Sequence, residues 1–533
     1  MNQVLVTTHD KPDRRLTWLV SGAILLKLLL LPFAQTMDAD AVSRTLISTD
    51  WLQHPVWITH GIWGPFHFYL TGFALFIWNN GIYAPVVLNI LLSGLMLLPF
   101  YFLVKREFNR DGAFVAACFL AISPIIFRVS LMNMAETPYL LLLTLTLNLL
   151  SKGFKSHQPL HFLLAGFSIT IASGIRFEPW FFISLFTIVI LLRKEKLNAF
   201  LFLLTAMLYP ATDMITNFIS DHYSFTNFFS NYPWNMHPAG YFAPPQTIDF
   251  LRRIWFIPFC WLISIGPPFA FITIKELLFK SKKEKDFTWL AIVFWAFFTL
   301  TEVSAIRGSI ILHNRFSATI TLLGLPFIAP YFNNLQTSKV RQAWLFGALT
   351  IGLTFIYNMQ NITPLPRLED QNGASVAKLV ARNVTMQSGL IIDFWEWQNP
   401  GYIELMSKLP PPNMFVINLD YDDKTKSDET TNFIQSHPKG VIILVKNSFL
   451  WQNTLISDGL LHFKFSSIIL NIQEIYKDDK VAVYCYKIQD FIDYLAKPYK
   501  VYICLYPHNQ AKHPSNCHIY AISPPERQFS TGI

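Results

Sequence analysis

Apolar runs separated by short charged connectors fill residues 16–361 of this 533-residue chain, and they constrain its fold more than any other feature. Hydrophobic residues make up 52% of the sequence and charged residues only 14%, whereas soluble domains carry about 25% charged residues. A bilayer crossing takes about 20 mostly apolar residues in helical form. We therefore predict an α-helical polytopic membrane protein with about 11 transmembrane helices, near residues 16–34, 82–104, 112–127, 137–151, 159–175, 179–192, 197–215, 254–278, 287–303, 316–332 and 343–361.

The lysine-rich connectors between these runs set the predicted orientation. They all fall on one side of the membrane if the N-terminus is cytoplasmic and the apolar run 66–78 lies along the membrane without crossing it. The net charge is +9 over residues 1–361 and −1 over residues 362–533, so the excess belongs to the membrane part. We interpret it as the positive-inside bias and do not expect a nucleic acid partner. The prediction is an N-terminus inside and a C-terminal domain outside the cytoplasm.

The character of the sequence changes after the last apolar run. Segments such as SGLIIDFWEW, MFVINLD, GVIILVKN and KVAVYCYKI are typical of buried strands, and two helical segments lie between them. Strands that alternate with helices predict a small α/β domain with a largely parallel sheet. The predicted organisation is a transmembrane domain over 1–361, an extracytoplasmic α/β domain over 362–490 and a poorly ordered tail over 491–533.

Two carboxylates stand directly after the first predicted span, in the segment MDADAVSR. Ionisable groups at the membrane surface are costly to place without a function. Asp38 or Asp40 could take a proton from an acceptor hydroxyl as a general base, or the two could hold a divalent metal together with Glu136. The alternative is a solvated loop in which an Asp caps a helix.

Further candidates follow at the outer ends of the spans. His60 and Trp63 have the chemistry of a sugar site, although Trp is also common in interfacial aromatic belts. An arginine at the membrane surface can bind a phosphate through its planar guanidinium group, or can extend to lipid head groups. The other predicted substrate-binding residues are Arg128, Glu136, Arg176, Glu178 and Arg315.

These motifs together resemble the GT-C superfamily of membrane glycosyltransferases, in the broad group of protein O-mannosyltransferases and the aminoarabinose transferase of lipid A. That group has an acidic pair opening the first outer loop, an interfacial helix, and an acidic residue opening the next outer loop. MDADAV, residues 66–78 and AETP with Glu136 match these three features. GIRFEP with Arg176 and HNRFSATITLLGLPF with Arg315 resemble further motifs of these families. The resemblance covers residues 1–361.

The resemblance implies a hexosyl or pentosyl transferase that takes its sugar from a polyprenyl phosphate. Many of these families carry adjacent Asp-Glu where this chain has Asp38-Ala39-Asp40, so the base is Asp38 or, alternatively, Asp40. Arg176, Arg128 or Arg315 would stabilise the leaving phosphate, and the sugar would be inverted at its anomeric carbon. The acceptor is a lipid, a glycan or a protein, and the expected location is the bacterial inner membrane.

Two other functions stay open from the sequence. A transporter or flippase of lipid-linked sugars would place ionisable groups near the bilayer midplane, where only Lys27 lies well inside a predicted span. A ligase or polymerase of lipid-linked glycans is a third alternative. The sequence predicts no certain cofactor and leaves a divalent metal open.

Overall fold

The computed structural model of the chain comprises two compact units. The described residues are 14–33, 38–58, 63–108, 110–219, 247–280, 288–307, 310, 312–332, 341, 344, 347–348, 352, 368–393, 398–417 and 421–489. One unit consists of residues 1–381 and 396–408, and the other of residues 382–395 and 409–533. The predicted tail 491–533 and nearly all of the predicted span 343–361 lie outside the described residues.

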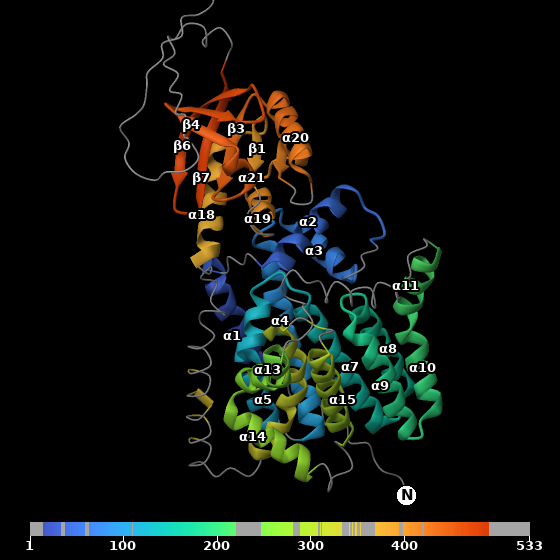
Figure 1. Ribbon diagram of the computed structural model, residues 1–533. Helices are drawn as coiled ribbons and strands as arrows, with labels where there is room; N and C mark the ends of the chain where they lie inside the picture. The colour runs from blue at the N-terminus through green and yellow to red at the C-terminus, as the bar shows by residue number, and fades with distance from the viewer. Residues whose placement is uncertain are drawn as a thin grey trace, which may run out of the picture. The chain divides into compact units, whose positions relative to one another are not determined.

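The first unit is helical, and its helices follow the apolar runs of the sequence (Figure 1). Its first half contains α1 (Arg14–Leu30), η1 (Leu31–Phe33), α2 (Ala39–Gln53), α3 (Phe66–Ile77), α4 (Ala84–Glu107), α5 (Arg110–Ile122), α6 (Pro124–Ser130), α7 (Glu136–Ser156), α8 (Pro159–Ser173), α9 (Glu178–Leu192), α10 (Lys196–Ala206) and α11 (Leu208–Ile219). Its second half contains α13 (Thr247–Ile265), α14 (Pro267–Lys275), η2 (Glu276–Lys280), α15 (Thr288–Ile306), η4 (Asn314–Phe316), α16 (Ser317–Gly324) and η5 (Leu325–Phe332). Helix α18 (Leu368–Asn383) follows, and its last two residues belong to the second unit.

Helices α4, α7, α8 and α10 pack in succession and share one apolar core with α5, α9, α13, α15 and α16. Helix α4 shows why such a segment is helical: Pro85 stands in its first turn, and Lys105 and Arg106 end it, which suits the negative end of the helix dipole. Within the described residues, α4 and Trp289–Ile306 are long and apolar enough to cross a bilayer, and the number rises to five if each of three bent helix pairs is one span. Eleven crossings therefore stay a prediction.

The sharpest of the three bends interrupts the predicted span 254–278. The run 254–278 forms α13 and α14, whose axes are bent by 105° at Gly266. Gly266 has a positive φ of 90°, and Pro267 and Pro268 follow it. Because proline has no N–H to donate to the preceding turn, the helix ends here and begins again in a new direction.

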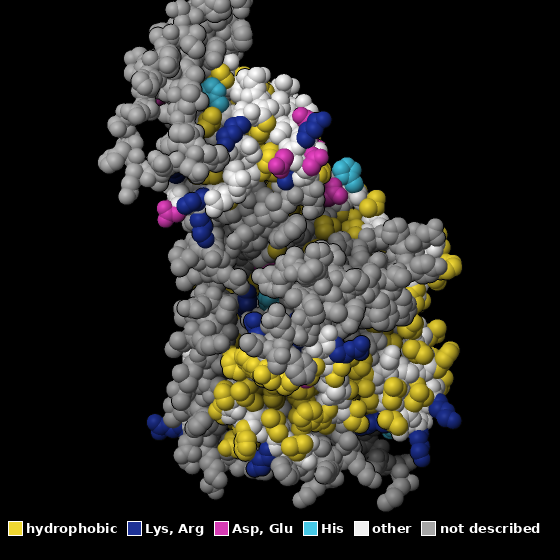
Figure 2. Space-filling view, in the orientation of Figure 1, with side chains coloured by type: hydrophobic (Ala, Val, Ile, Leu, Met, Phe, Trp, Pro, Cys, Tyr) yellow, Lys and Arg dark blue, Asp and Glu magenta, His cyan; other side chains and the backbone are white. Residues whose placement is uncertain are grey.

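Large hydrophobic side chains cover the outer surface of the helical unit. Figure 2 shows them gathered over its face, with few charged side chains among them. Exposed examples from four helices are Leu192, Phe200, Phe271 and Trp295. An apolar surface of this extent is unfavourable in water and suits contact with lipid.

Helix α3 occupies the run 66–78 and has two unlike faces. His67, Phe68 and Thr71 are buried, whereas Phe76 and Ile77 are largely exposed. With 12 residues, α3 is shorter than the ~20 needed to cross a bilayer. Its length and its two faces fit a helix that lies along a membrane surface, as the sequence predicts.

The second unit contains one seven-stranded mixed sheet in the order β2-β1-β3-β7-β6-β5-β4 (Figure 1). Its strands are β1 (Gly389–Ile392), β2 (Met414–Val416), β3 (Lys439–Val445), β4 (Thr454–Ser457), β5 (Leu460–Phe463), β6 (Ile469–Lys477) and β7 (Val481–Ile488). The unit also contains η6 (Pro411–Asn413), α20 (Asp423–Ser436) and α21 (Phe449–Gln452). Among the described strands, only β1–β2 and β1–β3 pair in parallel. The prediction of a largely parallel sheet is therefore wrong, because the hairpin strands β4, β5 and β6 were not recognised.

Helix α19 (Gln398–Ser407) was predicted as a helix of the α/β domain, but it belongs to the helical unit. In the sequence it lies between β1 and β2, two neighbouring strands of the sheet. It packs against α2. The chain therefore leaves the sheet after β1, adds one helix to the other unit, and returns to form β2.

Candidate active site

Asp38 begins helix α2 as its N-cap residue. Its backbone is extended, its Oδ1 accepts a hydrogen bond from the Asp40 N–H at 3.1 Å, and its carbonyl accepts one from the Val42 N–H at 3.0 Å. Aspartate is preferred at this position because it satisfies an N–H group that has no partner within the helix. The capping role and a catalytic role do not exclude each other, since Oδ2 takes no part in the cap.

Asp40, in the first turn of α2, forms an ion pair with Arg315. The Arg315 Nη1 donates to the Asp40 Oδ2 at 2.5 Å, and the Arg315 Nε lies 3.8 Å from the Glu136 Oε1. Arg315 comes from η4, which is 275 residues further along the chain than Asp40. The arginine therefore connects the carboxylate pair at the start of α2 with the acidic residue that opens α7.

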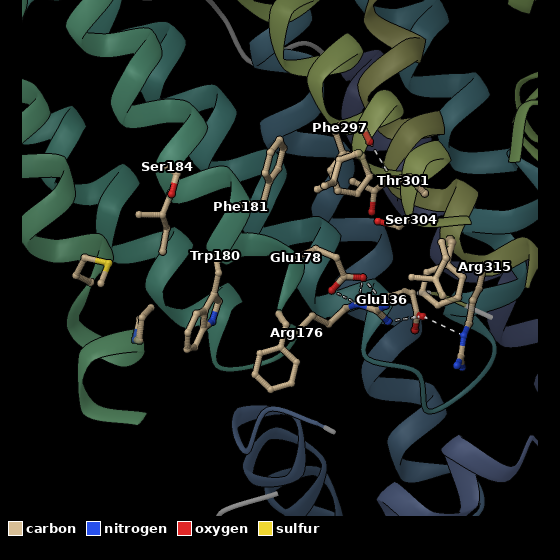
Figure 3. A pocket seen from close by; sticks show the side chains of 18 of the residues that line it. Glu136, Arg176, Glu178, Trp180, Phe181, Ser184, Phe297, Thr301, Ser304 and Arg315 are labelled. Carbon is tan, nitrogen blue, oxygen red and sulfur yellow. Dashed lines mark hydrogen bonds and ion pairs between the residues drawn. The ribbon is translucent and has the colours of Figure 1, made fainter. Parts of the chain in front are cut away.

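Arg176 lies on the other side of Glu136, so Glu136 stands between two arginines (Figure 3). The Arg176 Nη1 donates to the Glu136 Oε1 at 2.5 Å. Its Nε and Nη2 donate to the Glu178 carboxylate at 2.9 and 2.5 Å. The side chain of Glu136 is 4% exposed and that of Arg176 14%. A carboxylate buried to this degree is tolerable because it is paired.

The turn that carries Arg176 is fixed to the start of α3 by close backbone contact. The Phe66 N–H donates to the Gly174 carbonyl at 2.9 Å. A Cβ on Gly64 would lie 2.2 Å from that carbonyl oxygen, and a Cβ on Gly174 would lie 2.4 Å from the Phe66 ring. Both positions therefore require glycine, and the contact holds the turn 174–177 beside α3.

A buried arginine on α2, Arg44, also belongs to this site although it is not among the residues predicted from the sequence. It lies one helical turn after Asp40, and its guanidinium carbon is 4.5 Å from the centre of the Trp63 ring. Arg44 is 4% exposed and His67 1%, and the Nε and Nη1 of Arg44 and the Nδ1 of His67 have no hydrogen-bond partner within the described residues. The i, i+4 spacing from Asp40 is the signal in the sequence that could have identified Arg44.

The loop before Glu136 is tied to α2, α3 and α4 by amide side chains. Asn133 donates to the Thr45 hydroxyl at 2.8 Å and accepts from the Thr71 hydroxyl at 3.2 Å. Asn89 donates to two carbonyls of the loop, those of Met132 at 2.6 Å and Met134 at 3.0 Å. This network fixes where α7 begins, and with it the position of Glu136.

The remaining predicted residues are placed as follows. Arg128 donates through Nη1 to the Asn314 Oδ1 at 3.3 Å, beside Arg315 in the chain. His313 accepts the Arg315 N–H on its Nδ1 at 3.2 Å, and burial lowers the pKa of His313 to about 3, so this ring is neutral. His60 lies outside the described residues.

A divalent metal does not fit the carboxylates of the cluster as they stand. The Arg315 guanidinium lies between Asp40 and Glu136, where a shared cation would have to bind. Within the described residues, no three His, Cys, Asp or Glu side chains come close enough to hold a metal ion. The reaction proposed below therefore uses no metal at this position.

An apolar cavity of about 620 Å³ opens beside the charged cluster. Figure 3 shows Arg176, Glu136 and Arg315 along one edge of it, with Trp180 and Phe181 from α9 and Phe297 from α15 along its walls. The other residues of its lining with polar side-chain groups are Glu178, Ser184, Thr301, Ser304 and Thr319. A cavity of this size, apolar along its walls and charged at one edge, suits an amphipathic ligand with an anionic head.

Burial and neighbouring charges shift the pKa values of Asp38 and Arg176. Burial raises the pKa of Asp38, and the charge of Asp40 adds to this effect while Arg315 opposes it. Burial alone would lower the pKa of Arg176, but Glu136 and Glu178 outweigh it and hold that pKa above its ordinary value. The site therefore combines a carboxylate made more basic by its surroundings with arginines that stay charged.

A helical unit with an apolar surface, a charged cluster beside an apolar cavity, and a mixed sheet in the C-terminal part are the features that the GT-C resemblance of the sequence leads us to expect. The comparisons with known proteins agree with this resemblance. The family model described as dolichyl-phosphate-mannose-protein mannosyltransferase matches residues 54–212, which run from the end of α2 into α11 and contain Arg128, Glu136, Arg176 and Glu178.

Two solved structures share the fold over nearly the whole chain. They are ArnT from Cupriavidus metallidurans bound to undecaprenyl phosphate (12% identity, TM-score 0.61) and the same protein in the apo state (13% identity, TM-score 0.59). Each match covers 89% of this chain and 98% of the other. The apo oligosaccharyltransferase of Archaeoglobus fulgidus is more distant, with 13% identity, coverage of 81% and 70%, and a TM-score of 0.48.

A comparison of the sequence with curated proteins finds no match. The resemblance seen in the sequence is confirmed by the family model over residues 54–212 and by the fold shared with ArnT.

Proposed function

We propose that this protein transfers a sugar from a polyprenyl-phosphate donor to a hydroxyl acceptor at the outer side of a membrane. The observation that carries the proposal is the position of the charged cluster at the edge of the apolar cavity. The cavity offers room for part of a lipid chain, and Arg176 and Arg315 stand where its phosphate would arrive. The ligand named for the ArnT structure, undecaprenyl phosphate, has this chemistry.

The donor phosphate would have to compete with carboxylates for these arginines. Arg176 is paired with Glu136 and Glu178, and Arg315 with Asp40. A phosphate that binds Arg315 would weaken the hold of that arginine on Asp40. Donor binding would then make the acidic pair at the start of α2 more available for a proton.

The reaction follows as a single displacement. The acceptor hydroxyl oxygen forms a bond to the anomeric carbon, the bond from that carbon to the phosphate oxygen breaks, and the phosphate leaves with the electron pair. The acceptor proton passes to Asp38, or alternatively to Asp40. The arginines stabilise the charge that develops on the leaving phosphate. We favour Asp38 because burial raises its pKa and the described residues give its Oδ2 no ion pair, whereas Asp40 is paired with Arg315.

The described residues give no observation that favours a transporter. Arg44, Glu136, Arg176 and Arg315 stand in or next to the first turns or connectors of helices. Lys27, in the last turn of α1, donates to the Ser93 hydroxyl at 2.9 Å. Transporters, in contrast, use ionisable groups near the bilayer midplane.

Exchange of the acidic residues tests the proposal. Asp38→Asn keeps the shape of the N-cap and its acceptor oxygen but removes the base, so we expect a ~10²–10⁴-fold loss of transfer with unchanged donor binding. Asp50→Asn is the matched control, because Asp50 lies on the same helix with a 78% exposed side chain. The assay is transfer from a labelled lipid-phosphate sugar in membranes. Normal turnover in both Asp38→Asn and Asp40→Asn would refute the proposed base.

Mass spectrometry of glycans and lipids from cells with and without the gene identifies the sugar and the acceptor. The proposal expects a glycan or lipid that loses one hexose or pentose residue when the gene is absent. Accumulation of a complete glycolipid on the cytoplasmic side would support a flippase instead.

A further inference from the structure

Helix α19 packs against α2, the helix that begins with the acidic pair. Both helices belong to the helical unit, and they lie side by side in Figure 1. Tyr402 is 2% exposed and Ile403 is fully buried. On α2, Ala41, Val42 and Thr45 are buried as well. Helix α19 is therefore an integral part of the packing around the first outer helix.

The two helices approach so closely that only glycine fits at one position. A Cβ on Gly401 would lie 2.7 Å from the Val42 Cγ1 and 2.9 Å from the Leu46 Cδ1. Further along α19, the Leu405 Cδ2 lies 3.0 Å from where a Cβ on Gly81 would stand. A side chain added at Gly401 would therefore displace atoms of α2, because close-packed elements transmit such strain to one another.

The face of α2 that α19 covers is next to the candidate active site. Val42 follows Asp40 by two residues, and its N–H donates to the carbonyl of Asp38. Thr45, one turn further, is held on the other side by Asn133 from the loop that leads to Glu136. Helix α2 is thus fixed between the loop before α7 and α19.

We infer that α19 positions α2, and with it Asp38 and Asp40, for the transfer reaction. The inference rests on the proposed function, and it makes α19 a positioning element. Its role is to set the place of the acidic pair relative to Arg315 and Glu136. In the sequence, α19 lies between β1 and β2 although it belongs to the helical unit.

The sensitivity of such an arrangement follows from the geometry of proton transfer. A displacement of about 1 Å in a catalytic group can cost ~10²-fold in rate. A methyl group on Gly401 must move Val42 by several tenths of an ångström, because the 2.7 Å contact is with a branched side chain that cannot simply rotate away. We therefore expect Gly401→Ala to lower kcat by about 10-fold, with little change in the KM for the donor.

A second substitution on α2 should reverse this loss. Val42→Ala removes the atom that the new methyl group meets, and Leu46 can move its flexible end. We expect Val42→Ala alone to reduce transfer by less than about threefold, and Gly401→Ala with Val42→Ala to recover to that level. Gly22→Ala is the control for a glycine exchange in a helix, because no atom lies within 4 Å of a Cβ there.

Hydrogen exchange of the α2 amides measures the same effect without catalysis. Gly401→Ala, and also Leu405→Ala as a milder change in α19, should raise exchange across residues 39–53, and the double variant should return it toward normal. If the variants exchange faster but the wild-type protein transfers no sugar, the proposed function is refuted. The positioning of α2 by α19 would still stand in that case. Unchanged exchange and unchanged kcat in Gly401→Ala would refute the inference, as would a double variant no better than Gly401→Ala.

Discussion

Exchange of Arg315 for glutamine separates the two roles that the structure gives to this arginine. Arg315 holds Asp40 at 2.5 Å and approaches Glu136 at 3.8 Å. In the proposed reaction it also stabilises the leaving phosphate. Glutamine keeps most of the length and the hydrogen-bonding ability of the side chain but removes its charge. The variant therefore leaves Asp40 without its cation, while Glu136 keeps Arg176.

The expected loss of stability can be estimated from the ion pair. Two unit charges 2.5 Å apart attract each other by about 7 kcal/mol at an effective dielectric constant of about 20. Most of this is offset by the cost of removing both groups from water, and loss of one partner of a buried pair costs ~3–5 kcal/mol. The side chains of Arg315 and Asp40 are 16% and 26% exposed, so we expect about 2–3 kcal/mol for Arg315→Gln.

The expected loss of activity is larger and separable. Removal of one group that stabilises transition-state charge costs ~10²–10³-fold in kcat. Arg315→Gln with Asp40→Asn removes both charges, so the double variant should regain most of the stability without regaining activity. Thermal unfolding in detergent and transfer from a labelled lipid-phosphate sugar measure the two quantities.

Arg307→Gln is the matched control for this experiment. Arg307 lies directly after α15, in the connector that leads to Arg315, but is exposed, so its loss should change neither quantity measurably. If Arg315→Gln transfers sugar at the wild-type rate, Arg315 does not stabilise the leaving group. A double variant as unstable as Arg315→Gln alone would show that the ion pair with Asp40 is not what Arg315 contributes to the fold.

Three further predictions concern pH and topology. Because burial raises the pKa of Asp38, the acidic limb of the pH–rate profile should lie above the ordinary Asp value near 4. This limb should disappear in Asp38→Asn. A limb that persists in that variant would belong to another group. Burial raises the pKa of Asp393 to about 6 although Ser448 donates to its carboxylate, so the folded state binds more protons between about pH 4 and 6. The free energy of unfolding should fall by about 3 kcal/mol as the pH rises through that window, and thermal melts of Asp393→Asn should lack this slope; an unchanged slope would contradict it. In a background without native cysteines, an impermeant thiol reagent on intact cells should label a cysteine at Asp422 and not one at Lys283, and the reverse pattern would invert the predicted topology.

Helix positions and the chemistry of the acidic and basic residues could be predicted from the sequence. An apolar run of about 20 residues forms a helix in any low-dielectric environment, because its backbone groups must bond to one another. Asp38 and Asp40, Glu136 and Arg176 were recognisable because each is an ionisable residue at the edge of such a run. Their grouping in space was expected only through the resemblance to GT-C enzymes.

The sheet was predicted incompletely for a related reason. β1, β3 and β7 are largely buried and carry continuous apolar stretches that the sequence displays directly. β4 and β6 are mostly half-exposed or exposed, so their residues are mixed and resemble loops. A strand of this kind is defined by pairing with its neighbours, which is a property of the whole sheet.

Only the tertiary structure decided which residues became partners. The sequence does not show that Arg315 pairs with Asp40 from 275 positions away, that Arg44 is buried beneath Trp63, or that α19 leaves the sheet to cover α2. A side chain's type fixes its charge and its donors or acceptors locally. The group that satisfies them is selected by the packing of distant elements, where burial makes an unpaired charge too costly to keep.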